Sequence, residues 1–344
     1  MSPPTPTDTL RPRPADQIRP ATRHVIRLIA ALLIVLIVVA IARMFVGPTP
    51  GWPDARALPY RIDRLVIACI VGVALSVSGV ALQALLRNPL AEPFILGLST
   101  GAGVGVMGQL LLQRHTQHVL PDTRMGALAG SALTLMVVFL AGRRRGVIDP
   151  LGLLLVGVVI GTINGALIMF LNYVPGSAGL RPNIAQWMMG WIMEETTRPM
   201  MYAMAAVTAC GLGVLCWKAR ALDVAAFSDA EAQSVGVNLA RLRVWLFVIA
   251  SVLAACAVML AGPIAFVGLI CPHLVRRMLG PGHGPLLIGS ALAGATLLLL
   301  ADMTSYGLHL VFHWGIMPLG IFTAMLGGVF FLWILRTQPD GALR

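Results

Sequence analysis

The chain of 344 residues is too apolar for a soluble protein. Its hydrophobic share is 58%, its charged share is 11% and its mean hydropathy is +0.84, whereas a soluble domain carries roughly 25% charged residues. The net charge is +11, but no basic stripe alternates with stacking aromatic residues, so the charge gives no argument for a nucleic-acid partner. The composition therefore indicates a protein of the lipid bilayer.

Apolar runs recur along the whole chain, and about 20 such residues are needed to cross a bilayer as a helix. We predict an all-α membrane protein with ten transmembrane helices and no soluble domain. A disordered basic tail is expected over 1–24, one membrane domain over 25–336, and a short tail over 337–344. The expected spans are 25–46, 65–86, 94–113, 125–141, 151–172, 200–217, 244–262, 264–279, 286–303 and 316–335.

The basic residues indicate the orientation. With ten spans both termini lie on one side, and that side receives 17 of the 25 Lys and Arg residues, against 7 on the other. Because cytoplasmic loops carry the excess of basic residues, we place both termini in the cytoplasm. No small-residue cleavage site follows the first apolar run, so we predict that it remains as a span.

Glycines recur four residues apart in three of the expected spans. This spacing lets helix backbones approach closely in lipid, so it predicts a dense bundle. A proline-containing stretch, RNPLAEP, separates the second span from the third, because Pro89 and Pro93 disfavour a continuous helix. The glycine runs are Gly97–Gly101–Gly105, Gly126–Gly130 and Gly157–Gly161–Gly165.

Ionisable groups inside the spans are few. Asp302 lies near the outer end of the ninth span, where a capping role or an arginine partner competes with a transport role. His309 and His313 are spaced to bind a metal on a helix, but no third ligand is near, and a pair at the membrane interface is the competing interpretation. Mid-span carboxylates suited to ion coupling are almost absent.

The sequence contains no energy-converting motif of its own. A P-loop needs GxxxxGK[ST], yet the single lysine, Lys218, has no glycine loop before it, and no HExxH motif occurs. The segment 225–243, AAFSDAEAQSVGVNLARLR, is too polar to span the bilayer and falls on the cytoplasmic side. We predict a short helix-turn-helix there, which an energy-supplying partner protein could contact.

Four blocks carry a resemblance to a known family. They are RNPLAEPFILGLSTGAGVG (87–105), GPIAFVGLICPHLVRRMLG (262–280), LLLAD (298–302) and MPLGIFTAMLGGVFFLWILR (317–336). In this order they resemble the permease subunits of type II bacterial ABC importers, the FecCD family of iron-siderophore, haem and vitamin B12 permeases. The resemblance extends from about residue 58 to 336.

The resemblance assigns a role to segment 225–243. Residues 230–236, AEAQSVG, are similar to the EAA…G coupling loop of ABC permeases, a short helix that sits in a cleft of the ATPase. Gly236 is expected to allow a tight turn between two short helices. The coupling residues implied are Asp229, Glu231, Ala232, Gly236 and Arg241.

The resemblance also implies a docking site on the outer side. Arg61 and Arg64 in YRIDR resemble an RxxR pair that meets acidic residues of the binding protein in B12-type permeases, and Tyr306 aligns with a further arginine there. Asp63 is expected to neutralise the pair in part. We expect exposed side chains, each ion pair contributing about 0–1 kcal/mol; anchoring to lipid headgroups is the competing interpretation.

The resemblance implies a transport subunit of the bacterial inner membrane, not an enzyme. No cofactor is expected on this chain, because ATP-Mg is used by the partner. The implied partners are a second permease (identical or homologous), two cytoplasmic ATPase subunits and an extracytoplasmic substrate-binding protein. An iron(III)-siderophore is the first choice of substrate, before vitamin B12 and haem. The alternatives are an ion-coupled secondary transporter and a membrane enzyme using His309, His313 and Asp302.

Overall fold

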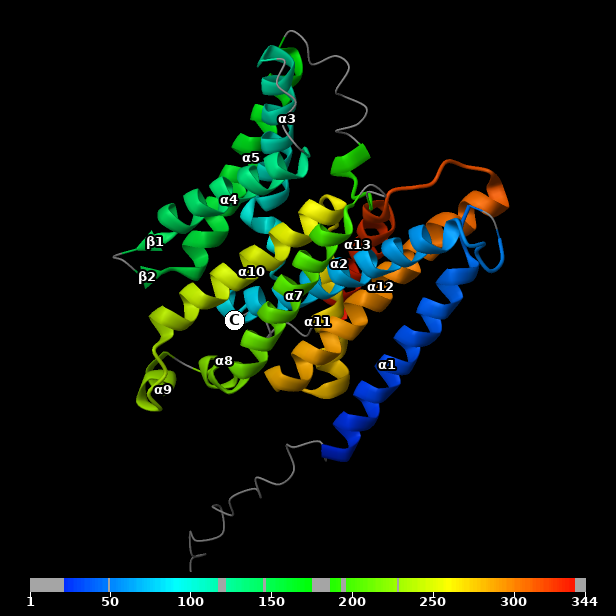
Figure 1. Ribbon diagram of the computed structural model, residues 1–344. Coiled ribbons are helices and arrows are strands. Elements are labelled where there is room, and N and C mark those ends of the chain that lie inside the picture. The colour runs from blue at the N-terminus through cyan, green and yellow to red at the C-terminus, as the bar shows by residue number, and fades with distance from the viewer. Residues whose placement is uncertain are drawn as a thin grey trace, which may run out of the picture.

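Helices form nearly all of the regular structure. The computed structural model describes residues 22–48, 50–116, 122–144, 147–174, 186–192, 196–227 and 229–337 (Figure 1). The elements are α1 (Thr22–Phe45), α2 (Ala57–Leu86), η2 (Pro93–Leu96), α3 (Leu98–Thr116), α4 (Arg124–Ala141), β1 (Arg143–Arg144), β2 (Val147–Ile148), α5 (Pro150–Tyr173), α7 (Arg198–Trp217), α8 (Ala219–Ala225), α9 (Asp229–Ser234), α10 (Leu239–Ala261), α11 (Val267–Leu279), α12 (His283–Phe312) and α13 (Leu319–Thr337).

Each of the ten predicted spans corresponds to a helix. Seven described helices, α1, α2, α4, α5, α7, α10 and α12, are long and apolar enough to cross a membrane. Helix α11 has only 13 residues, which is short of the roughly 20 that a span requires. The all-helical membrane fold is therefore confirmed, whereas the count of ten spans and the cytoplasmic termini stay predictions. The predicted tails fall largely outside the described residues, although α1 already begins at Thr22.

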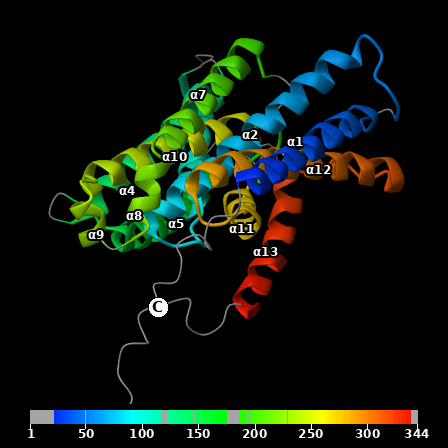
Figure 2. The ribbon, with the colours of Figure 1, turned by 90° about the horizontal axis from the view of Figure 1, so that it is seen from below.

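Helix α2 forms the centre of the body. It packs against α10, α11, α12 and α7, and it runs through the middle of the molecule in Figures 1 and 2. Two glycines make this packing close: Gly72 faces the backbone of Gly294 on α12, and Gly79 faces that of Gly268 on α11, with no space for a Cβ atom at either position. Helix α2 is thus fixed from several sides.

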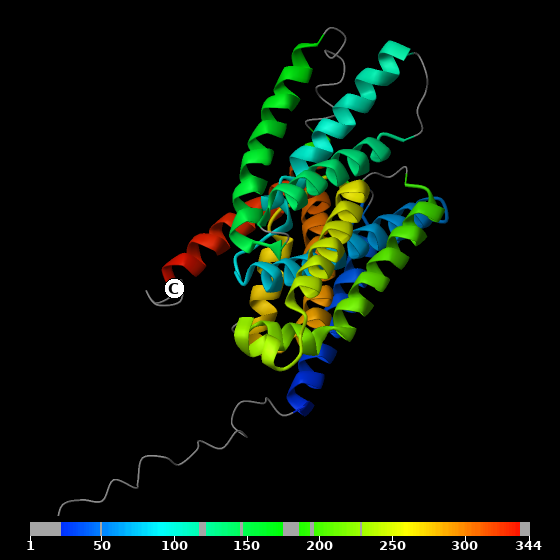
Figure 3. The ribbon, with the colours of Figure 1, turned by 90° about the vertical axis from the view of Figure 1, so that its left-hand side faces the viewer.

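Helices α3, α4 and α5 form a second packed group, seen at the top of Figure 3. The predicted glycine runs lie at its contacts, since Gly101 and Gly105 on α3 face the backbone of Gly130 and Gly126 on α4. Within the group, Asn164 of α5 donates a hydrogen bond to Thr134 of α4, at 3.1 Å. The predicted packing role is confirmed for these four glycines, whereas a Cβ atom at Gly165 would meet open space.

Two short helices occupy one end of the bundle. Helices α8 and α9 connect α7 to α10 and lie at the bottom of Figure 1. Helix α13 contacts mainly α11 and α12, and it stands away from the body in Figures 2 and 3. It exposes Met325, Val329 and Leu332. An apolar face of this kind is covered by lipid or by another membrane subunit.

Candidate coupling and docking sites

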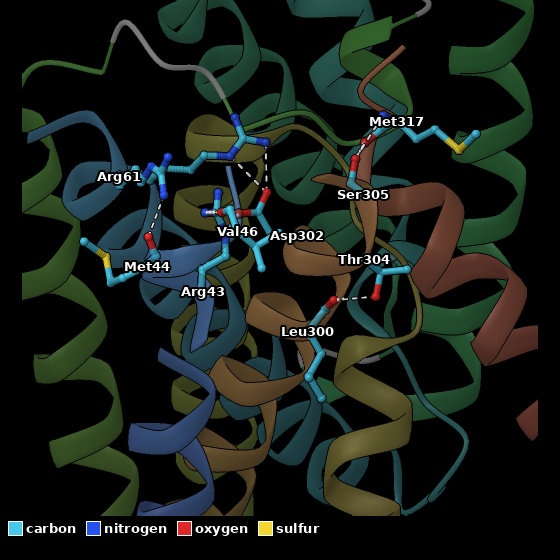
Figure 4. A network of polar contacts seen from close by, with 10 residues as sticks. Arg43, Met44, Val46, Arg61, Leu300, Asp302, Thr304, Ser305 and Met317 are labelled. Atoms are coloured by element: carbon cyan, nitrogen blue, oxygen red, sulfur yellow. Dashed lines mark hydrogen bonds and ion pairs between the residues drawn. The ribbon is translucent and has the colours of Figure 1, made fainter. Parts of the chain in front are cut away.

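Asp302 lies at the centre of a cluster of buried charges. Its carboxylate is fully buried and accepts from Arg43 Nε at 2.6 Å and from Arg64 Nε at 2.9 Å (Figure 4). We call Arg43, Arg64 and Asp302 the buried triad, since each side chain is at most 5% exposed. It joins α1, α2 and α12. Of the two sequence-based interpretations of Asp302, the arginine partner is thus the one that the structure contains.

The ring of Tyr306 packs against both arginines of the buried triad. Tyr306 follows Asp302 by one helical turn, so both side chains lie on the same face of α12. The guanidinium of Arg43 lies 4.7 Å from the centre of its ring, and that of Arg64 lies 4.9 Å away. A ring face attracts a cation by roughly 0.5–2 kcal/mol. Because two arginines share one carboxylate, the ring offsets part of the excess positive charge.

Arg61 supports the loop between α1 and α2. Its Nη1 atom donates to the carbonyl of Met44 at 2.6 Å and to that of Gly51 at 2.9 Å. Its guanidinium also fills the space where a Cβ atom of residue 47 would stand, so Gly47 is required for close contact. The side chain is 5% exposed. Arg61 therefore holds the loop against the helix ends.

These observations correct two expectations about the predicted docking residues. We expected exposed side chains, but Arg61, Arg64 and Tyr306 are all buried. We expected Asp63 to neutralise the two arginines, but its carboxylate instead lies 3.5 Å from the guanidinium of Arg198. The physical reason is that α2 begins at Ala57, eight residues before the predicted span, and carries these arginines into the bundle.

The three predicted docking residues are nevertheless close together in space. They line a single cavity of about 500 Å³ at the loop between α1 and α2. Arginine side chains dominate its polar lining, because Arg43 and Arg56 also reach it, whereas Asp54 is the one carboxylate among its lining residues. Tyr60 at the cavity is 67% exposed. The cavity can therefore accept an acidic group that enters from outside.

The predicted coupling residues lie on and after α9. Ala232 is completely buried and belongs to the main core, whereas Glu231 and Arg241 are exposed. Helix α9 ends in a Schellman motif: Val237 N–H donates to the Ala232 carbonyl at 3.1 Å, and Gly236 N–H to that of Gln233 at 2.9 Å. Buried on one side and capped at its end, α9 can move with the helices that it contacts.

Gly236 forms the predicted turn, but one of the two helices that the turn joins is long and not short. Its φ of +88° lies in the left-handed region, and a Cβ atom there would meet no neighbour. The glycine is therefore required by backbone conformation and not by packing. The turn joins α9 to the long α10, not one short helix to another. Helix α10 then begins at Leu239, and the preceding Asn238 caps it, since its side chain accepts from Arg241 N–H at 3.0 Å.

Asp229 connects α9 to two long helices. Its carboxylate lies 2.6 Å from Arg87 Nη2, just after α2, and 3.0 Å from Arg243 Nη2 on α10. We call Arg87, Asp229 and Arg243 the surface triad. Partial burial raises the pKa of Asp229, but the charges of Arg243 and Arg87 and their hydrogen bonds outweigh it and hold the pKa below its ordinary value. The carboxylate is therefore ionised at physiological pH.

Sequence reasoning did not connect Arg87 and Arg243 with Asp229. Arg87 is the residue that terminates α2 in the left-handed conformation, with φ of +49°. It also donates to the carbonyl of Ala225 at the end of α8, at 3.0 Å. The available signal was local: Asp229 and Arg243 both belong to segment 225–243, and Arg87 opens the RNPLAEP break.

The break after α2 holds the start of α11 in place. Gln83 donates to the carbonyl of Gly268 at 3.1 Å and accepts from Arg276 at 3.1 Å. The carboxylate of Glu92 accepts from the backbone N–H of Phe266, which precedes α11. Gln83 on α2 and Glu92 in the break thus satisfy backbone groups at the start of α11.

The predicted histidine pair does not form a metal site among the described residues. His309 bonds through its Nδ1 atom to the carbonyl of Trp314, and His313 terminates α12. Within the described part of the chain, no group of three His, Cys, Asp or Glu side chains is placed to hold a metal ion. The two histidines instead complete the exposed end of α12.

Comparisons with known proteins agree with this arrangement. The chain matches the model of the FecCD transport family over residues 25–337. It is 36% identical to the hemin transport system permease protein HmuU of Yersinia pestis over 286 residues, which are 82% of this chain and 84% of that protein. It is 33% identical to the vitamin B12 import system permease protein BtuC of Escherichia coli O17:K52:H18, covering 92% of this chain and 97% of that protein.

A solved structure has the same fold. It is a metal-chelate type ABC transporter in an inward-facing conformation, which aligns with a TM-score of 0.79 and 27% identity. The alignment covers 91% of this chain and all of that chain. Since the family model extends from within α1 to the end of α13, and the relatives match over most of their lengths, this chain is a multi-pass membrane permease that belongs to the FecCD transport family.

Proposed function

We propose that two copies of this permease, or one copy and a homologous permease, enclose a path through the bacterial inner membrane for a metal chelate. An iron(III)-siderophore is our first choice of substrate, with vitamin B12 and haem as alternatives. The relatives are named as hemin and vitamin B12 permeases, and the solved structure as a metal-chelate type transporter. ATP-Mg is bound by two separate cytoplasmic ATPase subunits, and no cofactor resides on this chain.

The observation that carries the proposal is the attachment of α9. Its buried Ala232 packs into the core, its end is fixed by the turn at Gly236, and Asp229 ties it to α2 and α10 through Arg87 and Arg243. A helix anchored in this way transmits a push from the ATPase to the central helices. Asp229, Glu231, Ala232, Gly236 and Arg241 are the proposed coupling residues.

Docking of the binding protein is proposed at the basic cavity. An acidic side chain of that protein would enter beside the exposed Tyr60 and reach Arg61, while Arg64 and Tyr306 form the cavity wall. Because Arg64 already contacts Asp302, its contribution would be smaller than that of an arginine without a carboxylate neighbour. This modest positive field would steer the binding protein toward the cavity.

The path itself is proposed at the apolar recess beside α13. A cavity of about 360 Å³ lies between η2, the segment 186–192 and the start of α13. Met188, Met189 and Phe94 contribute to its lining, and methionine side chains adapt to irregular shapes. A wall of this kind fits passage of a bulky chelate by size rather than by specific hydrogen bonds.

Gly236→Pro tests the proposal. Proline cannot adopt a φ of +88° and lacks the N–H that bonds to Gln233. Uptake and ATP hydrolysis would be measured in vesicles containing the complete complex, with the proton gradient dissipated. We expect Gly236→Pro to assemble and dock the binding protein normally, but to hydrolyse ATP with little uptake.

Gly236→Asn is the matched control. Asparagine adopts a positive φ more readily than most residues with a side chain. It keeps the N–H that donates to Gln233, and its Cβ atom would meet no neighbour. The control should retain coupled uptake. Parental uptake by Gly236→Pro, or loss of parental uptake when the proton gradient is dissipated, would contradict the proposal.

A further inference from the structure

An apolar groove of about 300 Å³ lies between α4 and α10. Leu128, Leu135 and Phe139 line it on α4, and Phe247, Val252 and Cys256 on α10. Its surface is almost entirely apolar, and none of these residues takes part in the proposed coupling, docking or path. Lipid or another membrane protein must cover a surface of this kind, since water would leave it poorly solvated.

The length of the groove matches one leaflet of the bilayer. Leu128 and Phe139 mark its two ends on α4, and their separation is about 16 Å at 1.5 Å per residue. One leaflet contributes about 15 Å to a hydrocarbon core of about 30 Å. A transmembrane helix of another subunit would need a groove of roughly twice this length, whereas one acyl chain fits it.

One end of the groove carries an aromatic floor and a positive charge. The rings of Phe139 and Phe247 stack at 5.2 Å, and the guanidinium of Arg143 lies 3.9 Å from the centre of the Phe139 ring. Arg143 is exposed and makes no ion pair with a carboxylate among the described residues. It is also the first residue of the run 143–145, RRR. A phosphate group would complement this end.

We propose that the groove binds one acyl chain of an anionic phospholipid from the cytoplasmic leaflet, with the lipid phosphate against Arg143. The choice of leaflet rests on the proposed function, which places this end of α4 on the ATPase side. The short strand β2 joins this end to the surface triad, because Arg243 donates to the carbonyl of Ile148 at 3.5 Å while holding Asp229. A bound headgroup therefore lies next to the attachment of α9.

Lipid retention on the purified permease tests the proposal. The full chain would be placed in bilayer discs of phosphatidylcholine with phosphatidylglycerol as the anionic probe, and lipids retained after extraction would be counted by native mass spectrometry. We expect the parental chain to retain phosphatidylglycerol in preference to phosphatidylcholine. Arg143→Gln should reduce this preference roughly five-fold, as expected for one basic residue at an anionic surface.

Two further variants separate the groove from the charge. Ala132 is exposed and lines the groove, so Ala132→Trp should fill it and reduce retention of both lipids without disturbing the core. Arg27→Gln is the matched control, because Arg27 is an exposed arginine near an end of the lipid-facing α1. It should leave retention and preference unchanged.

The opposite outcomes are distinct. The lipid site would be overturned if all three variants retained both lipids, and preferred phosphatidylglycerol, to the same extent as the parental chain. Disulfide-linked dimers of a Val252→Cys variant would show that a second permease copy covers the groove, and would also overturn it. Because no step depends on transport, failure here leaves the import proposal intact, and failure of Gly236→Pro to uncouple transport leaves the lipid site intact.

Discussion

The molecule contains two clusters of the same composition, one carboxylate between two arginines, in opposite environments. In the buried triad, Arg43, Asp302 and Arg64 are at most 5% exposed. In the surface triad, the side chains of Arg87, Asp229 and Arg243 are 36%, 47% and 15% exposed. The distances are similar, from 2.6 to 3.0 Å. Contact geometry alone therefore does not distinguish them.

The solvent distinguishes them. An ion pair with water at hand contributes about 0–1 kcal/mol, because water can replace either partner. A buried ion loses its hydration, so removal of one partner costs about 3–5 kcal/mol. The ion pairs of the buried triad therefore stay formed, whereas those of the surface triad can break and re-form at a small cost in free energy.

Helix α2 connects the buried triad to the surface triad. Arg64 lies near its start and Arg87 follows its last residue, about 34 Å apart at 1.5 Å per residue. One end of the helix is therefore held by charges that cannot separate cheaply, and the other by charges that can. Movement of α9 can therefore reposition the end of α2 at Arg87 while the end near Arg64 stays in place.

The largest expected effect is that of Asp302→Asn. It leaves Arg43 and Arg64 buried without a counter-charge, so we expect the free energy of unfolding to fall by about 3–5 kcal/mol. The apparent thermal midpoint of the purified permease in detergent measures this loss. Asp63→Asn is the control, since Asp63 pairs at 3.5 Å with the exposed Arg198, and it should change stability by less than about 1 kcal/mol.

A combined variant separates the effect of the unpaired charges on stability from the effect of side-chain packing. Replacing Arg43 and Arg64 by Met together with Asp302 by Leu removes the whole buried triad, and such replacements are often neutral or stabilising. This variant should recover most of the midpoint that Asp302→Asn loses. Equal midpoints for Asp302→Asn and the parental chain would mean that the two triads do not differ as argued.

A smaller effect on stability is expected for Asp229→Asn. Exposed to water, the surface triad should contribute no more than about 1 kcal/mol, and this difference should vanish in molar salt, where the screening length is about 3 Å. The same variant should nevertheless raise the ATP hydrolysed per substrate imported, because α9 loses its connection to α2 and α10. Thermal midpoints at low and high salt and the uptake stoichiometry in vesicles measure both effects.

Asp302→Asn supplies the contrast for salt. Its destabilisation should persist in molar salt, because ions do not reach a side chain that is fully buried. If salt abolished the difference in both variants, both triads would be solvent-exposed in the membrane. If Asp229→Asn kept full coupling, the connection through Arg87 and Arg243 would not carry the push.

The sequence predicted the helices best where apolar residues continue to the helix end. Residues 151–172 were predicted as a span, and α5 runs from Pro150 to Tyr173. The prediction was too short where a helix continues through polar residues. Helix α12 was expected to end at 303 but ends at Phe312, since backbone hydrogen bonds continue through a stretch that hydropathy alone excludes. That extension is what places Tyr306 one turn after Asp302.

The pairing of charges could not be predicted in the same way. Arg64 and Asp302 are separated by 238 positions, and no periodicity relates residues on α2 and α12 at that distance. Segment 225–243 was recognisable because its signal is local: a polar run with glycine at the end of a short helix. The turn at Gly236 was therefore predicted, and the partners of Asp229 on other helices were not.

The smallest expected effect is the response of the surface triad to pH. The pKa of Asp229 is held below its ordinary value of 3.8, as Arg243 and Arg87 outweigh partial burial. A depressed carboxylate pKa means that the unfolded state binds the proton first, so the contribution to stability is complete above 3.8 and is lost as pH falls through the lower, folded value. Thermal midpoints of the parental chain and Asp229→Asn should therefore keep a constant separation from pH 8 to pH 5 and converge only below 3.8. Convergence that began near pH 6 would mean that the two arginines do not both hold this carboxylate, and α9 would then be attached to the bundle chiefly through Ala232.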